Sequence, residues 1–190
     1  DALPIFGTAK VTVAAKENGN YIGSLTGEFE IIAKNWGAPV IARIENQSFT
    51  GGEIKPVVEV SLNDGTKLVE GTDYETSYTD NVAVGTGAKA TITPKGNYTG
   101  NAASKTFKIV AGDIKDATIA TIPDQVYTGE ELKPALTITN GAYTLKEGTD
   151  YTAEYSNNKD LGEAKVAITG KGGYEGSATE TTFNIKNDFS

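Results

Sequence analysis

The sequence of 190 residues contains no cysteine, no histidine and no methionine. Without cysteine the chain can form neither a disulfide nor a thiolate nucleophile. Without histidine it lacks a Ser-His triad and an ordinary zinc site. We therefore expect stability to come from apolar cores alone. We also expect no enzyme activity and no cofactor.

Long apolar runs and positive charge are also scarce. No stretch of about 18 apolar residues could span a bilayer, so we expect no membrane insertion in this segment. No charged and apolar leader opens the chain, so any secretion signal has been removed or lies outside it. The net charge is -8, which repels phosphate backbones, so we expect no nucleic-acid partner.

The chain instead contains an internal repeat of about 77 residues, with matching positions 76 to 78 residues apart. Such a period indicates that one structural unit is built more than once. The matched stretches are FTGGEIKPVVEV with YTGEELKPALTI, LVEGTDYETSY with LKEGTDYTAEY, AKATITPKGNYTG with AKVAITGKGGYEG, and KTFKI with TTFNI.

A partial third copy opens the chain, where GTAKVTVAAKENGNYIG and GEFEI match only the last third of the repeat. The predicted domains are a partial repeat over 1–33, which supplies two strands, and full repeats over 34–111 and 112–190. A two-stranded hairpin is marginal alone in water. We expect residues 1–33 to dock on the second unit or to pair with a strand edge of a neighbouring molecule.

Within each full repeat, apolar and polar residues alternate in short runs between turn signals, which predicts strands. No window of ten or more residues shows a helical period. The short strands favour an all-β sandwich. Four aromatic residues at matching positions are expected to bury their rings: Phe49, Tyr98, Tyr127 and Tyr174. The predicted strands of the middle repeat are 40–44, 47–50, 57–62, 67–69, 74–78, 88–93 and 104–110.

The order Y-T-G, K-P, L-x-x-G-T-D-Y, K-G-N-Y-T-G and F-x-I resembles the tandem bacterial immunoglobulin-like repeats of large cell-surface proteins. The resemblance covers nearly the whole chain. It implies tandem Ig-like antiparallel β-sandwich domains of about 77 residues in an extracellular, often wall-attached protein. It carries no catalytic or ligand residues to this sequence.

Three aromatic residues are candidates for a ligand or joint contact. Trp36 could stack on a sugar or pack where two units meet, and the lone aromatic favours packing. Because the second linker has Gly112, Asp113 and Ile114 instead, we expect that role not to be shared. Tyr98 and Tyr174 lie in Gly-rich loops, which predict a tight turn with a buried ring.

Several polar groups have a structural and a functional interpretation. Asp73 and Asp150 are expected to cap backbone amides at a corner rather than to act as paired catalytic carboxylates. Calcium would need several converging oxygens, and solvated turns are the favoured alternative. The calcium candidates are Asp80-Asn81 and Asn157-Asn158 with Asp160. A Lys-Asn crosslink is not favoured, because no such pair recurs in both full repeats.

Two roles fit these expectations. The first is a non-catalytic extracellular stalk, spacer or adhesin segment of a bacterial surface protein, associated with the cell wall. The alternative is a carbohydrate- or protein-binding accessory module of a secreted enzyme, which would use loops that differ between the copies, such as 79–87 and 156–162. The partner would then be an unknown glycan or a host or cell-surface protein.

Overall fold

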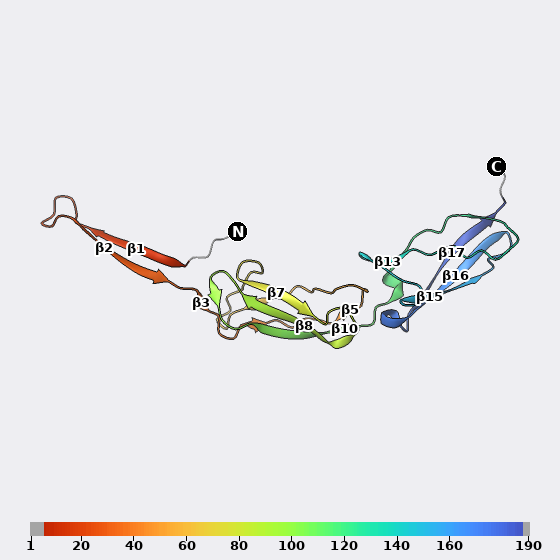
Figure 1. Ribbon diagram of the computed structural model, residues 1–190, viewed down its shortest axis with the longest axis horizontal. Coiled ribbons are helices and arrows are strands. Elements are labelled where there is room, and N and C mark those ends of the chain that lie inside the picture. The colour runs from red at the N-terminus through yellow and green to blue at the C-terminus, as the bar shows by residue number, and fades with distance from the viewer. Residues whose placement is uncertain (1–5, 188–190) are drawn as a thin grey trace. The chain divides into compact units, whose positions relative to one another are not determined.

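The computed structural model describes residues 6–187 and confirms the all-β class, with 47% of residues in strands and 3% in helix (Figure 1). The strands are arranged in several small sheets, which is consistent with a sandwich-like fold. The elements up to Val110 are β1 (Gly7–Ala14), β2 (Ser24–Ile31), β3 (Lys34–Asn35), β4 (Val40–Ile41), β5 (Gln47–Ser48), β6 (Val60–Ser61), β7 (Tyr74–Thr79), β8 (Gly85–Pro94), β9 (Tyr98–Thr99) and β10 (Ala103–Val110).

The later elements include two short 3-10 helices, which the sequence did not predict. Asp113 caps the first helix, because its side chain accepts a hydrogen bond from the Lys115 amide. Turns this short have no apolar periodicity that could reveal them. The elements are η1 (Ile114–Asp116), β11 (Thr118–Ile119), β12 (Gln125–Val126), β13 (Ile138–Asn140), β14 (Tyr143–Thr144), β15 (Tyr151–Ser156), β16 (Gly162–Gly170), η2 (Gly172–Tyr174) and β17 (Ala178–Lys186).

Two compact units divide the chain, and each draws on several stretches. The first contains 1–43, 57–77 and 90–105, and the second contains 44–56, 78–89 and 106–190. In the first unit, β1 and β2 form an antiparallel sheet of their own, β3 pairs with β9, and β4 pairs with β6. The domain bounds expected from the repeat remain predictions.

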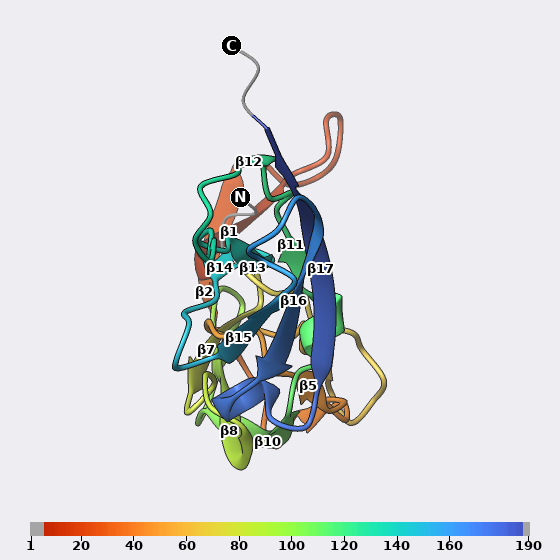
Figure 2. The same ribbon diagram turned by 90° about the vertical axis from the view of Figure 1, so that its right-hand side faces the viewer.

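In the second unit, the sheets β11-β13-β14 and β12-β17-β16-β15 enclose one apolar core. Figure 2 shows β15, β16 and β17 side by side. The alternation along β16 buries Ala164, Val166 and Ile168, while their neighbours face outward. The other members of the core are Ile114, Ile122, Ile138, Leu145, Tyr151, Tyr174, Phe183 and Ile185.

The segment 34–111 repeats this pairing. Its four-stranded sheet has the order β5-β10-β8-β7, which matches β12-β17-β16-β15 strand for strand. In both sheets the short first strand lies parallel to the last. The registers also agree, because Gln47 pairs with Ile109 just as Gln125 pairs with Ile185. The sequence repeat is therefore also a repeat of strand pairing.

The predicted strands 74–78, 88–93 and 104–110 are confirmed, whereas those predicted over 40–44, 47–50 and 57–62 contract to two residues each. The predicted inward face of β8 is buried at Ala88, Ala90 and Ile92. The segment predicted over 67–69 retains a single bridge, between Lys67 and Ser61. Short segments contract because turns and side-chain caps provide the hydrogen bonds that a ladder would otherwise supply.

The docking of residues 1–33 on the middle repeat stays a prediction. Both strands are solvent-exposed, and the large apolar side chains Val13, Leu25 and Phe29 have exposures of 67%, 77% and 54%. The two strands pair only with each other. Pairing with a neighbouring molecule remains a prediction.

Candidate functional site at the segment joints

Trp36, the only tryptophan, lies in the joint before the 34–111 segment and is 4% exposed. Its indole nitrogen donates to the Asn101 carbonyl at 3.0 Å, and its amide donates to the Thr99 carbonyl. The ring lies against Gly100, where an added Cβ would come within 2.7 Å of the indole. The side chain is therefore buried against its own repeat, and it offers no open face for stacking on a sugar.

The joint before 112–190 shares one backbone hydrogen bond with the first joint, but it contains the helix η1 in place of the strand β3. The Gly112 amide donates to the Gly173 carbonyl at 2.9 Å, as the Lys34 amide donates to the Asn97 carbonyl at 2.9 Å. Ile114 occupies the place of Trp36 and is completely buried. Ile114 belongs to the core of its own repeat, and the expectation that the role of Trp36 is not shared stays a prediction. Two unlike apolar residues fill equivalent positions, and a comparison by residue type does not reveal this.

Tyr174 is the centre of the second joint. Its ring is fully buried, and its hydroxyl accepts a hydrogen bond from the Asn140 side chain at 3.2 Å. Burial raises the pKa of the Tyr174 phenol above its usual value. Phe49, from the preceding repeat, meets the Tyr174 ring edge to face, with centroids 5.2 Å apart and planes at 73°. Such a pair contributes about 0.5–1.5 kcal/mol beyond the area it buries.

Two glycines allow this contact. A Cβ on Gly173 would lie 2.2 Å from the Phe49 ring, and one on Gly112 would lie 2.4 Å from the Phe49 carbonyl oxygen. Neither glycine has a positive φ, so the close approach of Phe49, and not backbone conformation, excludes a side chain there. The matching positions before the middle repeat hold Lys34 and Asn97.

The remaining aromatic positions differ in burial. Tyr98, which matches Tyr174, is half-buried in β9, and β9 pairs with β3. Tyr127, which matches Phe49, is 42% exposed, so the prediction of a buried ring is wrong there. The backbone of the two positions is nevertheless equivalent, because both amides donate to the last strand: Phe49 to Val110 and Tyr127 to Lys186. Only Phe49 has a neighbouring Tyr ring to pack against.

The corner carboxylates cap backbone amides, as predicted. Asp73 accepts a hydrogen bond from the Val69 amide, and Asp150 accepts one from the Lys146 amide, both at 2.8 Å. Asp150 also accepts a hydrogen bond from the Tyr143 hydroxyl at 3.1 Å and is itself 4% exposed. These carboxylates stabilise corners, and the structure assigns them no catalytic geometry.

The calcium candidates are also held by the fold. The Asn81 side chain donates to the Ile54 carbonyl at 3.0 Å, and Asn158 donates to the Leu132 carbonyl at 2.9 Å. Asp80 and Asn157 each have a φ of 54°, a left-handed turn that Asp and Asn tolerate. Over residues 6–187, no group of three or more acidic residues could hold a metal ion.

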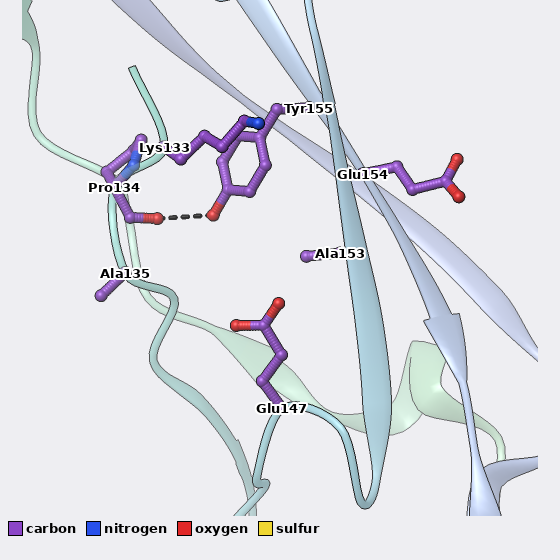
Figure 3. Close-up of a pocket in the computed structure, with 7 residues that line it drawn as sticks. All are labelled: Lys133, Pro134, Ala135, Glu147, Ala153, Glu154 and Tyr155. Atoms are coloured by element: carbon purple, nitrogen blue, oxygen red, sulfur yellow. Dashed lines mark hydrogen bonds between the residues drawn. The ribbon is translucent and has the colours of Figure 1, made fainter. Parts of the chain in front are cut away.

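A groove with a volume of about 660 Å³ lies beside β15 (Figure 3). The Tyr155 hydroxyl donates to the Pro134 carbonyl at 2.6 Å and closes one wall. Lys133 and Glu147 border the groove, whereas Glu154 points to the other side of the strand (Figure 3). The Glu147 and Glu154 carboxylates therefore point in different directions (Figure 3).

Comparison with known proteins leaves the function to be argued from the structure. No protein-family model matches the chain, and no curated protein matches it. In the described part of the chain, neither short helix has the length or the apolar character to cross a bilayer.

Proposed function

We propose that the chain is a non-catalytic spacer or adhesin segment of an extracellular, wall-associated bacterial surface protein, built from tandem Ig-like repeats. The contact between Phe49 and Tyr174 is the observation that carries this proposal. Phe49 of one repeat packs against the buried Tyr174 of the next. Gly112 and Gly173 leave room for this contact, because a Cβ at either position would collide with Phe49. A spacer needs such joints, because free linkers would let its units collapse on one another.

Other features support the same role. The strand-pairing pattern occurs twice, so a longer protein could be extended by adding copies. The net charge of -8 gives neighbouring molecules like charges, which favours solubility. Four of the polar candidate residues bond the backbone, namely Asp73, Asn81, Asp150 and Asn158.

The experiment compares chains with one, two and three tandem copies of residues 112–187. Small-angle scattering measures the maximum dimension of each chain. A spacer is expected to lengthen by a constant step for each added copy. A maximum dimension that stays nearly constant as copies are added would contradict the proposal.

The second candidate is a carbohydrate- or protein-binding accessory module, which the groove beside β15 favours. Tyr155 offers a ring surface, and Lys133 and Glu147 offer polar groups at its border. Aromatic rings flanked by polar side chains suit sugars and peptides. A glycan array tests this candidate. Binding of a glycan that is retained in Tyr155→Phe and lost in Glu147→Ala would support it. An array with no binding would exclude a glycan as the ligand.

A further inference from the structure

The hairpin of β1 and β2 has one apolar and one polar face. In an antiparallel pair, directly opposed residues point to the same face. The polar face has the ion pair of Lys10 with Glu28 at 2.9 Å and the hydrogen bond of Thr12 with Thr26 at 3.1 Å. The opposite face is apolar and exposed. Its members are Ala9, Val11, Val13, Leu25, Phe29 and Ile31.

This hairpin has the pairing register of β16 and β17. Ala9 pairs with Phe29 as Ala164 pairs with Phe183, so the match extends from sequence to geometry. The neighbouring pairs also coincide: Gly7 with Ile31 matches Gly162 with Ile185, and Val11 with Gly27 matches Val166 with Thr181. The hairpin is therefore already shaped as the last third of a repeat.

The second unit shows what covers such a face. In β16 and β17 the apolar face is buried, with exposures of 0% for Val166, 3% for Phe183 and 2% for Ile185. The residues that share this core come from the preceding part of the same repeat. They are Ile114, Ile122, Ile138, Leu145 and Tyr151.

We propose that the apolar face of β1 and β2 is an acceptor surface for the first part of a repeat. Its occupant is a segment with the side-chain pattern of residues 112–161, supplied from the N-terminal side of the hairpin on the same polypeptide. That segment places five apolar side chains over the face, and its strands pair with the free edges of both hairpin strands. The proposal does not depend on the spacer role.

The loop between β1 and β2 gives a second observation that favours the first part of a repeat as the occupant. Tyr21 lies in the sequence GNYIG, which matches GGYEG around Tyr174. Tyr21 is 83% exposed, whereas Tyr174 is fully buried against Asn140, which belongs to the covering part of its repeat. Tyr98, at the same position of the complete repeat 34–111, is half-buried, so an aromatic residue here is less exposed when that part is present.

In the test, residues 112–161 are placed directly before Gly7, in place of residues 1–6, and the rest of the chain is kept. The junction lies there because Gly7 matches Gly162, the residue that follows 161. We expect amide exchange in β2 to slow by at least about 100-fold relative to the chain without the addition, as in a folded sheet. The matched control carries Ile138→Asp and Leu145→Asp in the added segment only. It is expected to leave β2 exchanging as rapidly as in the original chain.

A second extended chain replaces residues 15–23 with residues 170–177, which are the last residue of β16 and the loop that joins it to β17. This chain controls for the possibility that the longer loop of residues 15–23 prevents the added segment from folding onto the hairpin. Unchanged exchange of β2 in both extended chains, while residues 112–187 of the original chain stay protected, would overturn the proposal. A second result would also overturn the proposal: sedimentation shows that the extended chain is a dimer, and Phe29→Ser abolishes that dimer. The occupant of the apolar face would then be a second copy of the chain.

Discussion

The Phe49 ring lies edge to face on the buried Tyr174 ring, 5.2 Å between centroids, and thereby joins one repeat to the next. In each full repeat the backbone amide at this position donates to the last strand of the same repeat, Phe49 to Val110 and Tyr127 to Lys186. The side chain is consequently free to reach the neighbouring repeat. The joint therefore depends on side chains that can be changed without disturbing the ladder.

Replacing Gly173 with asparagine, the residue found at the matching position 97, should separate the two rings. The added Cβ would lie 2.2 Å from Phe49, and such overpacking costs about 1–3 kcal/mol. Gly52→Asn is the control, because it lies in the same loop as Phe49 and has open space around its Cβ position. Nuclear Overhauser contacts between the rings should vanish only in Gly173→Asn, and their survival there would refute the role of this glycine.

Truncating Phe49 and truncating Tyr127 should have different consequences. Phe49→Ala removes a packed ring, and we expect the free energy of unfolding to fall by about 1–2 kcal/mol. Tyr127→Ala removes a ring that is 42% exposed, and the change should stay within about 0.5 kcal/mol. Denaturant unfolding of both variants measures the difference. Equal losses would mean that the contact with Tyr174 adds no stability.

The Asp150 carboxylate accepts two hydrogen bonds in a buried corner, so its removal should be costly. In Asp150→Ala the Lys146 amide and the Tyr143 hydroxyl lose their acceptor, which costs about 1–3 kcal/mol. Asp160→Ala, at an exposed position, serves as the control and should change stability by no more than about 0.5 kcal/mol. Thermal unfolding that does not distinguish the two variants would be inconsistent with the capping role.

Stability should fall at alkaline pH. Burial raises the pKa of Tyr74, Tyr151 and Tyr174 above the ordinary phenol value of about 10. The folded state therefore retains these protons after the unfolded state has begun to lose them. Their contribution is complete below about pH 10 and is lost as the pH rises through the folded pKa values. Unfolding curves between neutral pH and about pH 11 measure this, and an unchanged midpoint would contradict it.

The sequence predicts the all-β class, the longer strands and the corner caps, because these follow from local patterns. The alternation of apolar and polar residues predicts the buried side of β8 at Ala88, Ala90 and Ile92. The Gly-Thr-Asp-Tyr sequence predicts that its aspartate caps a backbone amide at the corner. The joints could not be predicted in this way. Ile114 and Trp36 occupy one position with different side chains, and the role of Gly173 depends on a ring far away in the sequence. Such roles come from tertiary contacts that local patterns do not encode.

The parallel pairing of β12 with β17 determines how a repeat would respond to tension. Because β12, the first strand of its sheet, lies beside the last strand and points the same way, a load carried between these two strands would shear their hydrogen bonds together. Single-molecule pulling should show a lower rupture force for Tyr127→Pro, which lacks the amide that bonds Lys186, than for Tyr127→Ala, which keeps it. We therefore expect the β12–β17 pair to resist tension as a mechanical clasp.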